Sequence, residues 1–244
     1  MSILQSIYTK IADGRKQLAY LLDPDKYQGD KLDKAIGLIG RTRPDLVMVG
    51  GSLVQGNTAQ LVETLKRHIP IPVILYPGSL LQLAPQADGI LFISLISGRN
   101  PEFLIGNHVV VAPILRQTNI EVIPTGYMLV DGGNVTSVQY MSNTMPIPPA
   151  KTDIAVATAL AGQYLGMKMI YMDGGSGALN PIPPAMISEV KGALDIPLII
   201  GGGLNTPEKV ASACNAGADL LVIGNAVEKD PSLLAEFKSI IDKH

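Results

Sequence analysis

The sequence predicts an α/β fold, a modified (βα)8 TIM barrel with an incomplete third helix. Apolar runs of strand length alternate with helical patterns along all 244 residues, as expected for parallel strands joined by crossover helices. Eight such runs can be placed, which is the number that a barrel of this length requires. Each of the last three runs leads into a glycine-rich turn. We therefore expect a single barrel domain over residues 1–244.

The expected strands are short apolar runs bounded by turn residues. They cover residues 18–22, 46–49, 73–75, 90–93, 121–125, 168–171, 198–200 and 220–223. The expected helices carry apolar residues at helical spacing and cover residues 29–42, 56–67, 101–117, 152–165, 183–193, 206–216 and 233–242. The helix at 206–216 has the clearest ends: Thr206 is a cap, Pro207 takes the first helical position, and Gly217 follows the last turn.

Two connections depart from this rhythm. Only residues 76–89 separate the third and fourth strands, and their prolines and glycines leave little room for a full helix. Either one strand is misplaced or the barrel has an opening there. Residues 131–151 are also rich in glycine and proline, which predicts a long extended loop of the kind that often covers a site.

Composition narrows the functional class. With 47% hydrophobic residues and a net charge of −2, the chain is too neutral for electrostatic binding of nucleic acid. The single cysteine, Cys214, favours a reducing, cytoplasmic location. Residues 1–17 alternate polar and apolar positions at helical spacing, which argues against a signal peptide, and no stretch is long enough for a transmembrane segment. A mean hydropathy of +0.27 with few aromatics suggests a homo-oligomer.

The most informative stretch is residues 171–177, Tyr-Met-Asp-Gly-Gly-Ser-Gly, which follows the sixth expected strand. Tyr171 and Asp173 are two residues apart, so in an extended chain they point to the same face. If that face is the barrel interior, a phenol and a carboxylate meet the ligand; otherwise Tyr171 is merely buried and Asp173 faces solvent. Such a carboxylate beside an amide-rich turn can remove a proton near a bound phosphate.

Two further glycine turns follow the seventh and eighth expected strands, at residues 201–203 and 224–225. Glycine lets backbone amides approach an anion without interference from Cβ, and a following helix adds its positive end. The loops after strands 7 and 8 are the usual phosphate-binding pair of barrels. The competing interpretation is that these glycines only make tight turns.

The first strand ends in Leu-Asp-Pro-Asp-Lys, residues 22–26, and the second in Gly50-Gly51-Ser52. Asp23, with Asp25 in reserve, is a candidate Mg²⁺ ligand, and the Ser52 hydroxyl is a candidate second contact to the metal or a diphosphate. Alternatively, Asp23 and Ser52 only cap the following elements. The three histidines, His68, His108 and His244, lack partner spacing for zinc or a triad and are expected at the surface or at helix ends.

Taken together, the chain resembles the geranylgeranylglyceryl phosphate synthase family, and its archaeal-like branch more than the shorter bacterial one. The resemblance is carried, in the order found in the family, by residues 22–26, 49–52, 171–178, 201–203 and 224–226. The family's altered third helix also matches the short crossover at 76–89. The family often has glutamate where this chain has Asp173, and a larger residue in place of Gly174.

The resemblance implies a Mg²⁺-dependent prenyltransferase that joins sn-glycerol 1-phosphate to a prenyl diphosphate, geranylgeranyl being the expected chain, and releases diphosphate. Asp23 and Ser52 would hold Mg²⁺ on the diphosphate. Asp173 would accept the proton of the attacking hydroxyl, and Tyr171 would position it. The implied acceptor site comprises Tyr171, Met172, Asp173, Gly174, Gly175, Ser176, Gly177, Gly202, Gly203, Gly224 and Asn225. A dimer or hexamer would fit the family, and a transient membrane-surface contact would serve product release.

Two other functions remain compatible with the residues. One is a phosphosugar isomerase or aldolase, since a phosphate site on a barrel serves many chemistries, although no catalytic lysine is evident at a strand end. The other is a non-catalytic phosphometabolite-binding protein. For a prenyl tail, we expect an apolar groove beside the short crossover, with Leu80, Leu81 and Leu83 on one wall; the alternative is that these leucines plug the side of the barrel.

Overall fold

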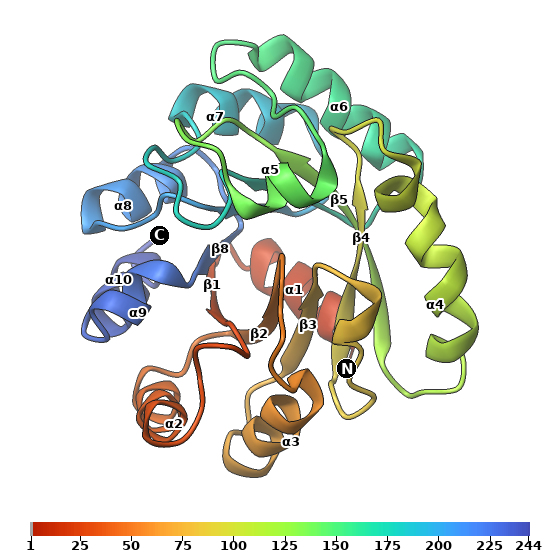
Figure 1. Cartoon of the computed structure of the whole chain (residues 1–244). Coiled ribbons are helices and arrows are strands. Elements are labelled where there is room, and N and C mark those ends of the chain that lie inside the picture. The colour runs from red at the N-terminus through yellow and green to blue at the C-terminus, as the bar shows by residue number, and fades with distance from the viewer. Residues whose placement is uncertain (1) are drawn as a thin grey trace.

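The computed structural model describes residues 2–244 and confirms the barrel. Eight parallel strands close in sequence order, with β8 pairing back onto β1 (Figure 1). The strands are β1 (Gln17–Leu22), β2 (Leu46–Gly51), β3 (Val73–Pro77), β4 (Gly89–Leu95), β5 (Glu121–Leu129), β6 (Met169–Asp173), β7 (Leu198–Gly201) and β8 (Leu220–Ile223). All eight expected strands are present, and β5 continues four residues beyond its expected end.

Most of the helices form an outer layer around the strands, whereas α1 lies across one end of the barrel (Figure 1). They are α1 (Ile3–Ala12), α2 (Asp30–Thr42), α3 (Thr58–His68), η1 (Leu80–Gln82), η2 (Glu102–Gly106), α4 (Asn107–Leu115), α5 (Ser137–Ser142), α6 (Thr152–Tyr164), α7 (Pro184–Ala193), α8 (Pro207–Asn215), α9 (Asn225–Lys229) and α10 (Leu233–Ile241). Within residues 2–244, no helix has the length and apolar character needed to cross a membrane.

Two apolar layers hold the barrel together. Outward-facing strand residues pack against the surrounding helices, while inward-facing ones fill the barrel with Ile3 and Ile7 of α1. The amides of Ile3 and Leu4 donate to the Glu121 carboxylate at the start of β5, at 2.5 and 2.9 Å. This contact caps the first turn of α1. The N-terminal helix thus fills one end of the barrel, so a ligand must enter from the other end.

The third crossover is incomplete, as expected. Only η1, three residues of 3-10 helix, lies between β3 and β4. These strands share two register pairs, Ile74 with Gly89 and Leu75 with Ile90, whereas β4 and β5 share seven. The barrel wall therefore opens beside η1 on the side where strands end.

The connection at 131–151 is less extended than predicted. It contains the helix α5, and Ile147 pairs with Val130 in an isolated bridge. Six residues are too few to show helical periodicity, so no apolar pattern predicts α5. The apolar side chain of Val138 packs against the inward-facing core, which fixes this short helix over the mouth of the barrel.

Candidate functional site

A polar cavity of about 680 Å³ lies at the C-terminal mouth of the barrel. Its walls come from the loops after β1, β2, β6, β7 and β8, so residues far apart in sequence share one space. Most residues expected at the site line it: Asp23, Ser52, Tyr171, Asp173, Gly175, Ser176, Gly177, Gly202, Gly203, Gly224 and Asn225. The strand ends therefore converge as the barrel geometry requires.

Met172 and Gly174 belong to the expected site but do not line this cavity. Strand alternation turns the Met172 side chain outward into the layer between strands and helices. The Gly174 amide donates to the Gly201 carbonyl at 3.1 Å, and a Cβ at residue 174 would lie 3.2 Å from that of Ala178. Met172 thus contributes packing, and Gly174 contributes close contact between the β6 and β7 loops.

Asp173 is a buried carboxylate held by three donors. Its Oδ2 accepts hydrogen bonds from the hydroxyls of Tyr127 at 2.7 Å and Tyr76 at 3.1 Å, and its Oδ1 accepts one from the Gly175 amide at 2.8 Å. Burial raises the pKa of Asp173 above its ordinary value, and these hydrogen bonds only partly oppose that rise. A carboxylate whose pKa is raised in this way is a stronger base than one in water.

One acceptor position of Asp173 remains free. A carboxylate has about four lone-pair sites, and two donors already fill those of Oδ2 whereas Oδ1 receives a single amide. Gly202 lies beside Oδ1: a Cβ there would sit 2.7 Å from this oxygen. Gly202 has a φ of +78°, which also favours glycine. The absence of a side chain at 202 therefore leaves Oδ1 accessible to a ligand.

Tyr171 points into the barrel, as its spacing from Asp173 predicts. Its ring packs between those of Tyr76 and Tyr127, with centroids 5.6 and 5.4 Å away. A Cβ at Gly201 would lie 2.4 Å from the Tyr171 hydroxyl, so Tyr171 sits directly against the β7 turn. Burial raises the pKa of all three phenols well above their ordinary value, and they stay protonated donors.

Sequence reasoning missed Tyr76 and Tyr127. Tyr76 stands at an inward-facing position near the end of β3, where strand parity could have indicated it. Tyr127 fell outside the expected fifth strand, which ended at Thr125 before Gly126 interrupts the pattern. In the folded chain that strand continues past Gly126 and brings Tyr127 to Asp173.

The glycine turns after β6, β7 and β8 present free backbone donors. The amides of Gly177, Gly203 and Asn225 donate to no backbone or side-chain acceptor among residues 2–244. Gly177 and Gly203 have φ values of +81° and +69°, which L side chains rarely adopt. Asn225 Nδ2 donates to Ser176 Oγ at 2.9 Å and ties the β6 loop to the β8 loop. This arrangement suits a phosphate group bound by backbone amides.

The β1 loop places one carboxylate, Asp23, in the cavity. Its Oδ1 accepts from the Asp25 amide at 3.0 Å, and its Oδ2 lies 3.5 Å from Lys26 Nζ. Lys26 also donates to Glu228 of α9 at 2.9 Å. Burial lowers the pKa of Lys26, but its contacts with Glu228 and Asp23 raise it on balance, so the ammonium stays charged. Sequence reasoning did not assign Lys26 a role in the cavity.

Asp25 does not line the cavity but holds the loop after β2. Its carboxylate accepts from the amides of Gln55, at 3.0 Å, and Gly56, and so holds the loop after β2. That loop also carries Ser52, and it is fixed from the other side by Gln82 of η1. The Gln82 Nε2 donates to the Gly51 carbonyl at 2.8 Å, and its Oε1 accepts from the Gly51 amide at 3.3 Å. The short crossover thereby positions Ser52.

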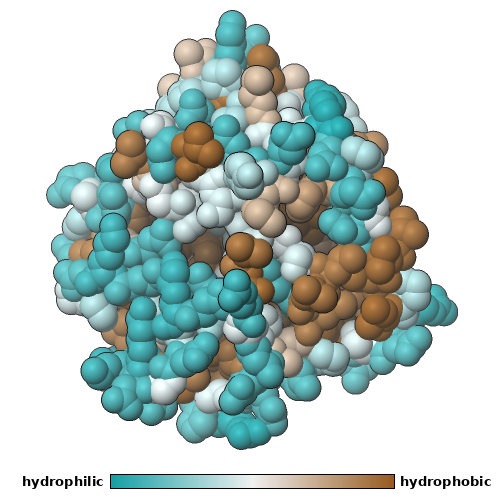
Figure 2. Space-filling model, viewed as in Figure 1, coloured by the Kyte–Doolittle hydropathy of each residue, from teal (hydrophilic) through white to brown (hydrophobic). Residues whose placement is uncertain are grey.

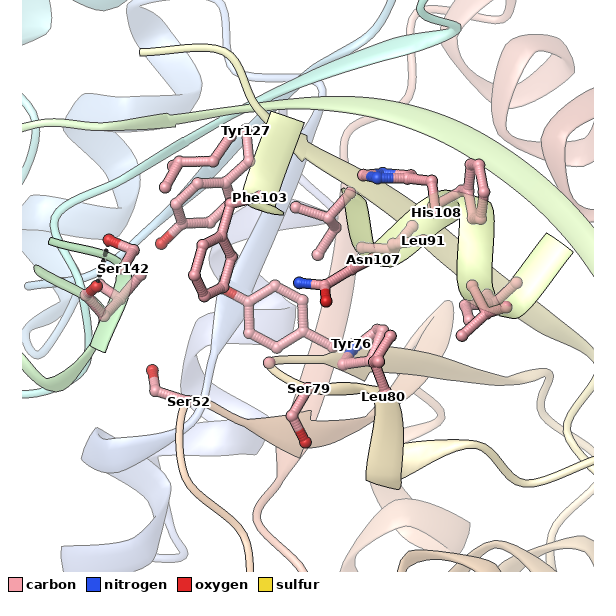
Figure 3. Close-up of a pocket in the computed structure, with 18 of the residues that line it drawn as sticks. Ser52, Tyr76, Ser79, Leu80, Leu91, Phe103, Asn107, His108, Tyr127 and Ser142 are labelled. Carbon is pink, nitrogen blue, oxygen red and sulfur yellow. Dashed lines mark hydrogen bonds between the residues drawn. The ribbon is translucent and has the colours of Figure 1, made fainter. Parts of the chain in front are cut away.

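A second, apolar cavity lies beside the polar one, where the barrel wall opens between β3 and β4. The two cavities share Gly51, Ser52, Tyr76, Tyr127 and Val138. Figure 3 shows the rings of Tyr76, Phe103 and Tyr127 gathered around the apolar space, with Ser52 at its edge.

Two of the three leucines expected along a groove line this apolar cavity. Leu80 and Leu83 are among its wall residues. Leu81 is not; its side chain is 90% exposed and points to solvent. The 3-10 geometry of η1 separates neighbouring side chains, so Leu81 turns away from the wall that its neighbours form.

His108 lies near the start of α4, one of the helix ends where the histidines were expected, but its side chain is buried rather than at the surface. It lines the apolar cavity from α4, and its ring meets that of Phe92 edge-on with centroids 4.5 Å apart (Figure 3). Burial lowers its pKa, so the imidazole is neutral at pH 7. The apolar run around this histidine places it on the inner face of a helix.

The closed ring of strands and the paired cavities at its C-terminal mouth define a (βα)8 barrel with a site built from the strand ends. The chain belongs to the PcrB family, which it matches over residues 11–242. It is 47% identical to the geranylgeranylglyceryl phosphate synthase of Spirosoma linguale over 229 residues, covering 93% of this chain and 92% of that protein. The corresponding synthase of Pyrococcus furiosus is 39% identical over 231 residues, covering 93% and 91%.

Solved structures are also similar to this chain, to different degrees. The crystal structure of (S)-3-O-geranylgeranylglyceryl phosphate synthase from Thermoplasma acidophilum, in complex with sn-glycerol-1-phosphate, superposes with a TM-score of 0.94. It is 30% identical in sequence, and the match covers all of both chains. The thiamine phosphate pyrophosphorylase of Pyrococcus furiosus shares only the fold, with a TM-score of 0.58 at 13% identity.

Proposed function

We propose that the chain is a prenyltransferase that forms an ether bond between sn-glycerol 1-phosphate and geranylgeranyl diphosphate, releasing diphosphate. The observation that carries the proposal is the junction of a polar and an apolar cavity beside the buried base Asp173. A phosphosugar isomerase or aldolase would need the polar cavity alone. Relatives that are 39–47% identical over most of the chain and named geranylgeranylglyceryl phosphate synthases support the same assignment.

The acceptor's phosphate would bind the free amides of Gly177, Gly203 and Asn225. Each charge-assisted hydrogen bond of this kind contributes on the order of 1.5–3 kcal/mol. With the phosphate held there, the glycerol hydroxyls extend toward the centre of the cavity, where Asp173 and Tyr171 line the wall. Binding by the phosphate thus serves to orient the nucleophile.

The free lone pair of Asp173 Oδ1 would accept the proton of the attacking hydroxyl. The hydroxyl oxygen then forms the new bond to the allylic carbon, whose bond to the diphosphate oxygen breaks. Tyr76 and Tyr127 hold the carboxylate in place through Oδ2, and Tyr171 would position the alcohol against it. Holding the reacting groups in contact is itself a large part of such a rate enhancement.

The residues present fit a magnesium ion bound together with the diphosphate. Mg²⁺ is usually held by one or two carboxylates plus substrate phosphates, and within residues 2–244 no cluster of three metal-ligating acidic, histidine or cysteine side chains occurs. Asp23 offers one carboxylate to the cavity, and Ser52 adds a hydroxyl at the junction. When bound, the ion would neutralise charge on the departing diphosphate.

The balance of charge in the polar cavity also supports a bound divalent cation. Two ammonium groups face four carboxylates among the side chains that line the polar cavity: Lys26 and Lys229 against Asp23, Asp173, Glu228 and Asp230. A phosphate and a diphosphate would add several further negative charges. Backbone amides alone cannot offset this excess, and a divalent cation bound with the diphosphate would supply the missing positive charge.

The test is a product assay with purified protein. sn-Glycerol 1-phosphate, its enantiomer and glycerol are each paired with geranyl, farnesyl, geranylgeranyl and a longer prenyl diphosphate, with Mg²⁺ or with EDTA. We expect prenylglyceryl phosphate only with sn-glycerol 1-phosphate and Mg²⁺, and most of it with the geranylgeranyl donor. Equal rates with glycerol would refute the phosphate site, and full activity in EDTA would refute the metal.

A further inference from the structure

Lys26 is an ammonium group in the polar cavity to which the proposed reaction gives no role. Its Nζ lies between two carboxylates, 2.9 Å from Glu228 Oε2 and 3.5 Å from Asp23 Oδ2. Among residues 2–244, Glu228 forms no ion pair with any other side chain, and it is only 14% exposed, so its charge depends on this one partner. Figure 2 shows hydrophilic side chains gathered on the side of the barrel mouth where Figure 1 places α2 and α9.

The β1 loop and α9 fix the position of this ammonium. The Asp23 carbonyl accepts hydrogen bonds from the amides of Lys26, at 2.9 Å, and Tyr27, at 3.2 Å, so the chain turns and brings the Asp23 and Lys26 side chains together. The Tyr27 side chain is buried and anchors this turn. Glu228 belongs to α9, which begins at Asn225 directly after the β8 turn. Lys26 therefore links the loop expected to hold a metal with the segment expected to hold the acceptor's phosphate.

Asp23 cannot serve Lys26 and a divalent cation equally. A cation on the Asp23 carboxylate repels an ammonium that lies 3.5 Å from the same group. In the free protein Lys26 is shared by two carboxylates, so the three side chains together carry a net negative charge. An ammonium has three donors on a flexible stem, so Lys26 can keep its contact with Glu228 and still donate to a further acceptor. The oxygens of a diphosphate bound beside Asp23 are such acceptors.

We propose that Lys26 is a diphosphate-binding residue that neutralises Asp23 in the free protein and turns to the diphosphate when a metal ion takes its place on Asp23. Glu228 acts as a positioning residue, because it keeps the ammonium at the cavity wall in both states. This role rests on the proposed function, in which a metal ion and a diphosphate share the cavity. The two ligands therefore bind as a pair, since a metal alone has to displace Lys26 and a diphosphate alone faces the Asp23 carboxylate.

The test measures the binding of Mn²⁺, of inorganic diphosphate and of the two together, by calorimetry and by paramagnetic resonance of free Mn²⁺. Mn²⁺ stands in for Mg²⁺ because it prefers the same oxygen ligands. In Lys26→Met, Mn²⁺ alone should bind roughly 3- to 10-fold more tightly, because no ammonium competes for Asp23. Diphosphate added with Mn²⁺ should bind at least ~10-fold more weakly, because a charge-assisted hydrogen bond is lost.

Two further variants serve as controls. Lys26→Arg keeps the positive charge and should retain most of the affinity for Mn²⁺ and diphosphate together. Lys31→Met removes the same charge from a lysine that follows the same loop, lies over the Tyr27 ring at 5.0 Å from its centroid, and does not line the cavity. Its affinities should match those of the unmodified chain. Circular dichroism checks that each variant is folded.

Equal affinities in Lys26→Met and the unmodified chain would overturn the role of Lys26 and leave the proposed function standing. A parallel loss of both affinities would also overturn it, because that pattern indicates a merely structural role. An unmodified chain that binds no diphosphate in the presence of Mn²⁺ would overturn this role and the proposed function together.

Discussion

Replacing Tyr127 with phenylalanine should move the acid limb of the pH profile of kcat/KM to higher pH. The Tyr127 hydroxyl lies 2.7 Å from Asp173 Oδ2 in a buried environment and donates to the ionised carboxylate. Burial already raises the pKa of Asp173, and the hydrogen bond from Tyr127 is the strongest of the contacts that oppose the rise. Removing that bond must therefore raise the pKa further, because only the charged form of the carboxylate is destabilised.

The size of the effect follows from the type of hydrogen bond. A bond to a charged group contributes ~1.5–3 kcal/mol, and 1.36 kcal/mol corresponds to one pKa unit, so the limb should shift upward by ~1–2 pH units. Tyr76→Phe should shift it less, since that hydroxyl is 3.1 Å from the same oxygen. Asp173→Asn should lose ~10²–10⁴ in kcat, the usual contribution of a general base.

The assay is kcat/KM for sn-glycerol 1-phosphate from pH 5 to 9 at saturating prenyl diphosphate. The phosphate of the acceptor itself titrates near pH ~6, so the comparison between variants is the informative quantity. Tyr164→Phe serves as a control, because this side chain is 78% exposed and does not line the cavity. An acid limb that stays in place or moves downward in Tyr127→Phe would refute Asp173 as the base.

Three further predictions test other parts of the site. Asp23→Ala should lower Mg²⁺-dependent turnover at least ~10³-fold, since a Lewis acid contributes several kcal/mol. Calorimetry should show that this variant binds glycerol phosphate as the unmodified protein does. Asp25→Ala should mainly lower Tm, because the Asp25 carboxylate holds the β2 loop. Leu83→Trp should shift the product profile toward shorter prenyl chains, whereas Leu81→Trp, on an exposed side chain, should not. Gly203→Val should raise the acceptor KM at least ~10-fold without changing the prenyl diphosphate KM, because φ is +69° and a Cβ would lie 2.6 Å from the Asn180 carbonyl oxygen.

Patterns among neighbouring residues predicted most of the barrel's strands and connections. Alternating apolar periodicity is a property of neighbouring residues, so the sequence alone located the eight strands and the short third crossover. The two-residue spacing of Tyr171 and Asp173 likewise placed both side chains on one face of the strand, and the structure shows that this face is the barrel interior. The same alternation turns Met172 outward, so the strand pattern alone argues against Met172 as a site residue.

Which residues come together at the site was decided by the closed barrel and not by the sequence pattern. Tyr76 is 97 residues and Tyr127 is 46 residues from Asp173, and no sequence pattern records that their hydroxyls meet on one carboxylate oxygen. Only closure of the strand ring, a sum of many non-local contacts, brings them together. Tertiary structure also separates Leu81 from Leu83. Leu81 points to solvent, whereas Leu83 lines the apolar cavity beside the opening between β3 and β4.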